Sequence, residues 1–153
     1  MWNINNITDS TYRQKFFEVS AILEDWLGKF ENREILDFGC GEATTALSIA
    51  LRSKPKRVVA VDTHEEIENC ALYAKNQIGL ENFPKNFLIE KIKVDSPLYK
   101  FGTFDVIYAW SVFEHVSQNL IMDCLHKIKH ALKPDGLFLF KSLLYTIRLM
   151  ADI

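Results

Sequence analysis

The sequence has too few cysteines, and in the wrong pattern, for a disulfide framework or a zinc knuckle. Its 153 residues contain three, Cys40, Cys70 and Cys124, which are odd in number, widely spaced and without a CxxC pair. Both kinds of scaffold need paired or closely spaced cysteines. Free thiols fit a reducing compartment, so we expect a cytoplasmic protein.

Long apolar runs and a charge excess of one sign are also absent. No uninterrupted apolar stretch approaches the roughly 20 residues that cross a bilayer, and the N-terminus lacks a basic region followed by an apolar core. The formal net charge is -2 and the isoelectric point about 6.1, which gives no general electrostatic reason to bind a phosphate backbone. We therefore expect neither a membrane nor a nucleic acid as a partner.

Proline and glycine are scarce as well, with four and six residues, and no repeat, low-complexity tract or linker divides the chain. What is present suits one core, since 48% of the residues are hydrophobic and 11 are Phe. A chain of this size and composition can bury a sizeable core as one unit. The sequence thus predicts a single domain over residues 1–153.

Short apolar runs alternate with segments of helical periodicity. Five runs predict strands, at residues 34–38, 57–62, 87–95, 104–110 and 137–145. Apolar residues at helical spacing predict helices at residues 16–30, 43–50, 67–78 and 121–132, the last closed by "KPDG". This alternation predicts an α/β fold: a doubly wound, mostly parallel Rossmann-like sheet of about five strands with helices on both faces.

The turn after the first strand, "DFGCGEA", is the first candidate for a ligand site. Gly39 and Gly41 lack a Cβ atom, so their backbone NH groups can approach a ligand where the chain turns sharply. Asp62 ends the second strand, about 20 residues after the glycines, the separation at which an acidic side chain reaches ribose hydroxyls. Together these features predict a nucleoside with a polar tail, although each alone fits an ordinary turn or helix cap.

The glycine pattern narrows the choice of nucleoside. A dinucleotide fingerprint would need a glycine where this chain has Thr44, so a nicotinamide-dependent oxidoreductase is disfavoured. "DFGCGEA" instead resembles the D-x-G-x-G-x-G signature of class I S-adenosylmethionine (SAM) dependent methyltransferases, with Ala43 in place of the last glycine. The resemblance continues through "VVAVD", "GTFDVIYAWSVFEHV" and "LHKIKHALKPDGLFLF", in family order, over residues 33–141. The "SVFEHV" segment is similar to the branch that methylates small molecules.

The resemblance implies a role in SAM binding for each matching position. The first loop would wrap the methionine portion with Asp37, Phe38, Gly39, Cys40 and Gly41. The ribose hydroxyls would be held by Asp62, and the adenine would lie against Thr63, Asp95 and Ser96. The end of the fourth strand would line the methionine end of the pocket with Trp110 and Ser111. From the residues alone, Asp95 could equally be a turn residue and Trp110 a core aromatic.

Few catalytic residues are expected, because SAM carries its own activated leaving group and the protein mainly aligns the acceptor and excludes water. For a hydroxyl acceptor, His115 with Glu114 is the available general-base pair, although both could instead serve packing and a helix start. His126 and His130 have a metal-compatible spacing without a third ligand, so we expect no metal.

The sequence therefore predicts a SAM-dependent methyltransferase with a small-molecule acceptor. The alternative is a SAM-binding subunit or regulatory module with little intrinsic activity. Residues 33–141 would form the cofactor core, and residues 1–31 a helical region whose polar segment around Tyr12 and Arg13 acts as a mobile lid over the pocket.

The C-terminal edge of the sheet raises a separate expectation. Members of the resembled family usually continue beyond the fifth strand with a helix and a β-hairpin, whereas only "YTIRLMADI" follows here. An open edge at residues 137–145 would expose unpaired backbone groups. We expect a second copy of the chain or a partner subunit to cover it, unless the chain is a fragment of a longer protein.

Overall fold

The computed structural model describes residues 2–142 and 146–150. Its helices are α1 (Ser10–Leu27), α2 (Thr44–Arg52), α3 (Ile67–Gln77) and α4 (Ile121–Ala131). Its strands are β1 (Glu34–Phe38), β2 (Arg57–Asp62), β3 (Phe87–Lys91), β4 (Phe104–Trp110), β5 (Leu132–Lys141) and β6 (Thr146–Met150). Short 3-10 helices lie at η1 (Ile4–Asn6), η2 (Leu98–Phe101), η3 (Phe113–His115) and η4 (Gln118–Leu120).

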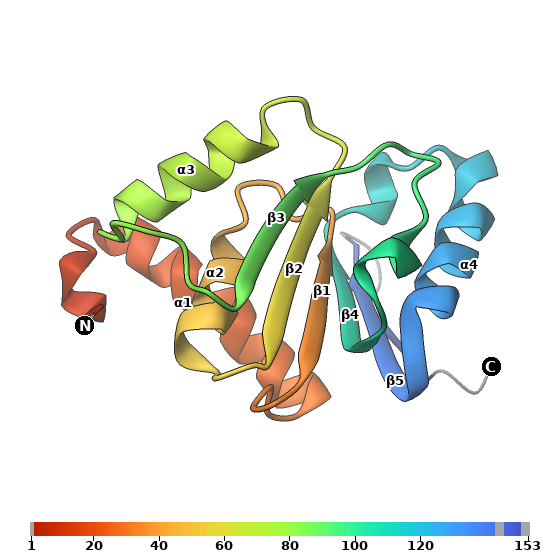
Figure 1. The fold of residues 1–153 in the computed structure, drawn as a ribbon, viewed down its shortest axis with the longest axis horizontal. Coiled ribbons are helices and arrows are strands. Elements are labelled where there is room, and N and C mark those ends of the chain that lie inside the picture. The colour runs from red at the N-terminus through yellow and green to blue at the C-terminus, as the bar shows by residue number, and fades with distance from the viewer. Residues whose placement is uncertain (1, 143–145, 151–153) are drawn as a thin grey trace.

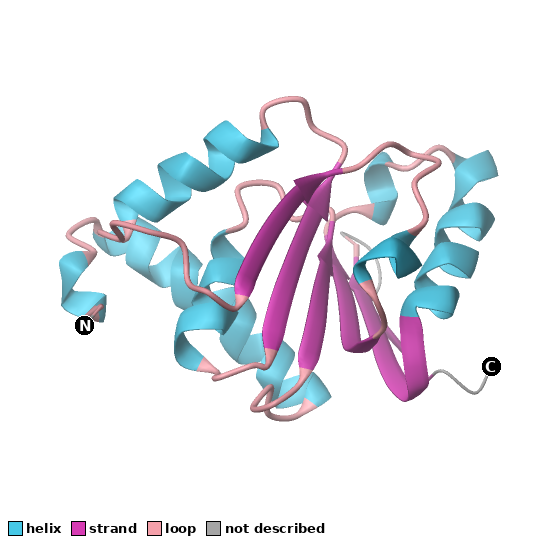
Figure 2. Cartoon of the chain, in the orientation of Figure 1, coloured by secondary structure: helices cyan, strands magenta, loops and turns pink. Residues whose placement is uncertain are grey.

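The strands form one sheet in the order β3-β2-β1-β4-β5-β6 (Figure 2). Strands β1 to β5 run parallel, with β1 in the middle, where Ile35 lies opposite Val58 of β2 and Val106 of β4. The change of direction along the chain, from β3 back to β4 across β1, is that of a doubly wound sheet. The predicted α/β fold is confirmed.

Helices cover both faces of the sheet (Figure 1). Residues of α1, α2 and α3, such as Phe16 and Leu47, are buried against one face together with Ile35. On the other face, Ile128 of α4 is buried with Leu36 and neighbouring strand residues. Ile35 and Leu36 are consecutive, and consecutive strand residues point to opposite faces. This explains why Ile35 and Leu36 are both apolar.

Helix α1 is fixed to α2 by polar as well as apolar contacts. The hydroxyls of Ser20 and Ser48, both buried, lie 2.9 Å apart, and Arg52 donates to Ser20 over 3.2 Å. The same guanidinium lies 4.1 Å from the ring centre of Phe17. None of the helices in the described ranges combines the length and apolarity needed to cross a membrane.

Two strands differ from their predicted bounds. The third ends at Lys91 because a turn follows, in which the Ser96 amide donates to the Lys93 carbonyl and the Lys93 amide to the Ser96 hydroxyl. The fifth begins at Leu132, so that "KPDG" ends the helix as predicted but lies inside the strand. Asp135 has a φ of 63° there, and the pairing with β4 shifts register.

The prediction of an open edge at the fifth strand is wrong. Residues 146–150 form β6, which pairs antiparallel with β5 from Lys141 opposite Thr146 to Leu137 opposite Met150. The C-terminal segment is too short for a helix and a hairpin but long enough for one strand. The backbone of β5 is therefore covered by its own chain, and neither a second copy nor a partner subunit is needed there. The part of the predicted fifth run at residues 143–145 lies outside the described residues.

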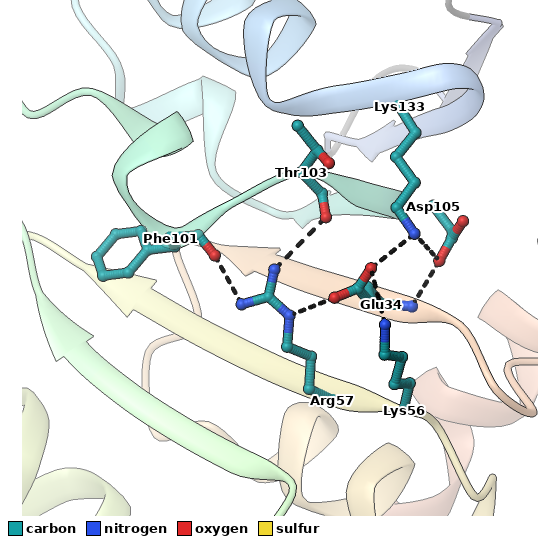
Figure 3. A network of polar contacts seen from close by, with 7 residues as sticks. All are labelled: Glu34, Lys56, Arg57, Phe101, Thr103, Asp105 and Lys133. Carbon is teal, nitrogen blue, oxygen red and sulfur yellow. Dashed lines mark hydrogen bonds and ion pairs between the residues drawn. The ribbon is translucent and has the colours of Figure 1, made fainter.

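A network of ion pairs joins the strands at their amino-terminal edge (Figure 3). Glu34, at the start of β1, accepts from Arg57 over 2.8 Å and pairs with Lys133 over 2.6 Å. Lys133 also pairs with Asp105 over 3.0 Å, and Asp105 accepts from the Glu34 amide. The Lys133 and Arg57 charges hold the pKa of Glu34 at about 2, despite partial burial. The Glu34 carboxylate thus connects β1, β2 and β5, and Asp105 adds β4 to the network.

Candidate functional site

A cavity of about 450 Å³ lies at the opposite, carboxyl-terminal edge of the parallel strands. This is where doubly wound sheets bind ligands. Its walls come from the loops after β1, β2, β3 and β4 and from α4. The lining residues are Phe38, Gly39, Gly41, Asp62, Thr63, Ile92, Lys93, Val94, Ser96, Ser111, Val112, His115, Val116, Ser117, Leu120, Cys124 and Lys127.

The glycine loop folds back on β2 at the rim of this cavity. The amides of Gly39 and Cys40 both donate to the Val61 carbonyl, over 2.8 and 3.0 Å. Gly39 has a φ of 77°, and a Cβ atom there would lie 2.5 Å from the Val112 side chain. Gly41 has a φ of 54°, and a Cβ atom there would meet nothing within 4 Å. Packing thus requires the first glycine, whereas the second leaves the backbone open to the cavity.

Ala43 stands where the family signature has its last glycine. It is fully buried and has a φ of 58° at the start of α2, a left-handed conformation that costs a residue with a Cβ atom roughly 1–2 kcal/mol. Ala43 thus has the left-handed backbone that a glycine adopts without strain, and its methyl group is buried in the core.

Asp62 connects the glycine loop to the loop after β2. One carboxylate oxygen accepts from the Gly41 amide over 2.8 Å, and the other accepts from the His64 amide over 3.0 Å. A carboxylate has about four lone-pair sites, so two can still accept from the hydroxyls of a ligand. Thr63 lines the cavity beside it. The fold thus brings Gly41 and Asp62 together at the cavity, and the ribose contact stays a prediction.

Asp37, just before the glycines, faces the core beneath α1 and α2 and does not line the cavity. It is only 3% exposed, and burial raises the pKa of its carboxyl to about 7, with the charge of Asp62 adding to the rise. Burial also raises the pKa of the Cys40 thiol, so Cys40 fits its place as a small packed residue and not as a nucleophile.

The end of β4 divides the predicted residues between two faces. Ser111 lines the cavity, with a φ of 56° and its amide donating to the Lys141 carbonyl over 2.7 Å. The side chain of Trp110 does not line it. Its ring stacks on the ring of Trp26 in α1, with the two ring centres 6.3 Å apart. The ammonium group of Lys141, which lies opposite Trp110 on β5, is 4.6 Å from the Trp110 ring centre.

The remaining predicted pairs are also split. Ser96 lines the cavity, whereas Asp95 is an exposed turn residue outside the lining. Glu114 and His115 are both exposed, and only His115 lines the cavity. The described part of the chain contains no group of three or more His, Cys, Asp or Glu side chains suited to a metal ion.

Sequence reasoning missed the wall that α4 and the loop after β3 contribute. Lys127 joins the two, because it pairs with Asp123 over 2.6 Å and donates to the Val94 carbonyl over 2.7 Å. Leu120 and Cys124 provide the apolar part of this wall. The helical periodicity placed Cys124 on the buried stripe, but no sequence signal indicated that this stripe also borders a cavity.

The N-terminal region approaches the glycine loop from the other side. The Tyr12 hydroxyl lies 3.2 Å from that of Thr44, and Lys15 pairs with Glu42 over 2.8 Å. Ahead of α1, Ile7 is fully buried and the Trp2 indole donates to the Ile78 carbonyl over 2.7 Å. The segment expected to act as a lid is thus placed beside the loop and anchored at its start.

Comparisons with known proteins agree with this geometry. A family model described as "Methyltransferase domain" matches residues 12–151. The fold is similar to a SAM-dependent methyltransferase from Aquifex aeolicus (24% identity, TM-score 0.67, covering 90% of this chain and 69% of that one). It is also similar to coclaurine N-methyltransferase bound to N-methylheliamine and S-adenosylhomocysteine (19% identity, TM-score 0.69, covering 85% of this chain and 36% of that one). A third similar structure is the [4+2]-cyclase SpnF (18% identity, TM-score 0.66, covering 81% of this chain and 43% of that one). The chain thus spans well under half of the last two. A comparison with curated proteins returned no match.

Proposed function

The chain belongs to the class I SAM-dependent methyltransferase family, and we propose that it binds SAM in the cavity at the glycine loop and transfers the methyl group to a small molecule. The observation that carries this proposal is the joint placement of Gly41 and Asp62. The backbone at Gly41 is open to the cavity, and the carboxylate 2.8 Å from its amide has acceptor sites left for ribose hydroxyls. A volume of about 450 Å³ suits one nucleoside-sized ligand.

The residues present fit SAM in three parts. Asp62 would accept from the ribose hydroxyls, and the loop from Gly39 to Gly41 would lie along the methionine tail. Ser96 and Thr63, with the apolar wall of α4, would enclose the adenine. When bound, SAM supplies a methyl group on a sulfonium leaving group. The chain has to position an acceptor and exclude water.

For the acceptor side we propose His115 as a general base toward a hydroxyl. Its imidazole is the only one of the predicted pair at the cavity wall, and an imidazole nitrogen can accept a proton from a hydroxyl. Glu114 lies outside the lining and is not included. A small-molecule acceptor is supported by the net charge of -2, which gives no general electrostatic reason to bind nucleic acid. The free cysteines suit a reducing cytoplasm.

A second candidate function is a SAM-binding module with little methyl transfer. The observation that favours it is the similarity to a protein named as a [4+2]-cyclase, which shows that this fold occurs with another chemistry. The two candidates share a cofactor site and differ in turnover. An acceptor library assayed for release of S-adenosylhomocysteine separates them.

The proposed site is tested by calorimetry with SAM, S-adenosylhomocysteine and NAD. We expect binding of the first two and none of NAD. Asp62→Ala should weaken SAM binding at least tenfold, because charge-assisted hydrogen bonds to the ribose, each on the order of 1.5–3 kcal/mol, are lost. Glu90→Ala removes an exposed carboxylate from the neighbouring strand and is the matched control. Unchanged affinity of a folded Asp62→Ala variant would contradict the assignment.

We further propose that residues 1–14 close over the loop when SAM binds. Tyr12 contacts Thr44 at the start of α2, so ordering of the loop by a ligand would be transmitted to this segment. Limited proteolysis within residues 1–14 should therefore slow when SAM is added. Equal cleavage rates with and without SAM would rule out a lid.

A further inference from the structure

Two tryptophan rings stack at the carboxyl-terminal end of β4, outside the cavity. Trp26 of α1 and Trp110 of β4 have ring centres 6.3 Å apart and ring planes inclined by 30°. Of the three tryptophans in the chain, Trp26 alone is exposed, with an exposed fraction of 38%. Tryptophan side chains are largely buried on average. Core packing alone therefore does not account for a ring that is held at the surface.

A lysine without an acidic partner adjoins the stack. Lys141 lies opposite Trp110 on β5, and its ammonium group is 4.6 Å from the centre of the Trp110 ring. None of the Asp or Glu side chains in the described ranges lies within ion-pair distance of this ammonium group. On the same strand, Lys133 pairs with both Glu34 and Asp105. The Lys141 ammonium group therefore keeps hydrogen-bond donors for an anion.

The stack lies next to the loop that would hold the methionine tail of SAM. In the strand register Tyr108 is opposite Asp37. Two residues further along each segment stand Trp110 and Gly39. The residue after Trp110, Ser111, lines the cavity. A molecule resting on the stack would thus lie beside the cavity, on the face of the sheet that α1 covers, with the end of β4 between them.

We propose that Trp26, Trp110 and Lys141 form the acceptor subsite, and that the acceptor is a small aromatic acid with a hydroxyl group. This inference rests on the proposed function. A planar ring would replace the ammonium group over the Trp110 ring, and its carboxylate would pair with the displaced ammonium. The exchange is favourable because a charge-assisted hydrogen bond to a carboxylate is stronger than a contact between a cation and an exposed ring.

The subsite recognises two halves of the acceptor and leaves the third group free to react. The tryptophan rings bind the planar body, and the lysine binds the carboxylate. In the transfer, the hydroxyl oxygen forms a bond to the methyl carbon, and the carbon–sulfur bond breaks with its electron pair left on sulfur. The hydroxyl proton passes to His115, the base proposed above. Ligand sites commonly combine aromatic side chains with a few polar groups in this way.

The test is calorimetric titration of the chain, saturated with S-adenosylhomocysteine, with benzoate, salicylate, 4-hydroxybenzoate and indole-3-acetate. We expect at least one of these acids to bind. The corresponding amide, which has the same ring and no charge, should bind on the order of tenfold more weakly, because the pair with Lys141 is lost. Cyclohexanecarboxylate, an acid without a planar ring, should bind about fivefold more weakly than benzoate.

Three variants assign the two halves of the ligand to their side chains. Lys141→Met keeps the unbranched side chain without its charge, and should lower the affinity for the acid to that of its amide. Lys85→Met changes an exposed lysine in the turn before β3 and is the matched control, which should leave both affinities unchanged. Trp26→Leu should weaken acid and amide by the same factor, about fivefold. Thermal melting and unchanged affinity for S-adenosylhomocysteine establish that each variant is folded.

The outcomes separate this inference from the proposed function. Failure of S-adenosylhomocysteine to bind would defeat the proposed function. Its binding without affinity for any acid of the panel would leave that function intact and overturn the subsite. Equal affinity for an acid and its amide would exclude Lys141 as the partner of the carboxylate.

Two further measurements test the role of the stack. With SAM, at least one hydroxylated acid of the panel should release S-adenosylhomocysteine, and binding without release by any of them would contradict the assignment as acceptor. Light scattering should give the same mass for the wild type and Trp26→Leu. A wild-type dimer that this substitution dissociates would make the stack a contact between two copies of the chain, and the inference would fail.

Discussion

Strand β1 carries one carboxyl group near each edge of the sheet, and their surroundings are opposite. Glu34, at the amino-terminal edge, pairs with Arg57 and Lys133, which hold its pKa at about 2. Asp37, three residues later, has no such pair, and burial raises its pKa to about 7. One edge contains a saturated ionic network and the other an uncompensated acid. The first arrangement stabilises the start of the sheet, whereas the second leaves a buried acid next to the proposed cofactor site.

The parallel register produces both environments. Because β1 and β2 start together, Glu34 lies opposite Arg57, and the start of β5 brings Lys133 alongside. At the other edge the same register places Tyr108 opposite Asp37. Left-handed residues other than glycine occur near both edges, Ala43 and Ser111 at this one and Asn32 and Lys54 at the other, so backbone strain does not distinguish the edges.

The largest effect should come from changing the carboxyl-terminal edge at Gly39. Gly39→Val combines a left-handed φ of 77° with a Cβ atom 2.5 Å from Val112. We expect a loss of about 3 kcal/mol or more in the free energy of unfolding and no detectable SAM binding. Urea denaturation and calorimetry measure the two effects.

Gly41→Ala is the matched variant, because it shares the left-handed backbone but meets no atoms within 4 Å. It should lose only about 1 kcal/mol of stability, while its methyl group enters the cavity and weakens SAM binding. Equal stability losses for the two variants would show that backbone strain, and not contact with Val112, determines the role of Gly39. Near-normal SAM affinity in a folded Gly39→Val variant would count against the loop as the cofactor site.

Asp37→Asn should change stability in a pH-dependent way. The folded-state pKa of about 7 exceeds the ordinary value, so the wild-type chain keeps this part of its stability at low pH and loses it as pH rises from about 4 to 7. The asparagine variant has no such loss. We expect it to match the wild type at pH 4 and to exceed it by about 2–4 kcal/mol at pH 8. If urea denaturation gave the same difference in free energy of unfolding between the two chains at pH 4 and at pH 8, Asp37 would not be an uncompensated acid.

Glu34→Gln should show the opposite dependence with a smaller amplitude. The folded-state pKa of about 2 lies below the ordinary value, so the network stabilises the wild type above pH 4.5 and is lost as pH falls toward 2. After allowance for solvent screening at the edge of the sheet, the loss in Glu34→Gln at pH 7 should be about 2 kcal/mol. The exposed Glu90 provides the control variant Glu90→Gln. A stability change at pH 7 no larger than that of the control would mean that the ion pairs contribute nothing.

The sequence predicted most strands because β-branched and aromatic runs such as "RVVAVD" have no other stable placement than a buried parallel sheet. It also indicated that the glycine loop and Asp62 lie together, because that placement depends on local backbone and spacing. It did not predict β6, since "TIRLM" has no strong apolar run and is stabilised by pairing with β5. The wall from α4 depends on Lys127 reaching the Val94 carbonyl, a tertiary contact without a local signal.

Trp110 shows that strand alternation can separate two neighbouring residues of one motif. It has the same strand parity as Val106 and Tyr108, both of which pack on the face under α1. Alternation along β4 therefore directs Trp110 to that face. The following residue, Ser111, lines the cavity instead. Identification of a motif assigned both residues to one site, whereas the period of two separates them.

The contrast between the two edges can be measured directly by amide hydrogen exchange with and without S-adenosylhomocysteine. We expect the ligand to protect amides in the glycine loop, at residues 62–64 and at residues 92–96, and to leave the amides at Glu34 and Arg57 unchanged. NAD at the same concentration should protect none of them. Protection centred on the amino-terminal edge, or equal protection by NAD at the glycine loop, would contradict the assignment of the carboxyl-terminal edge as a SAM site.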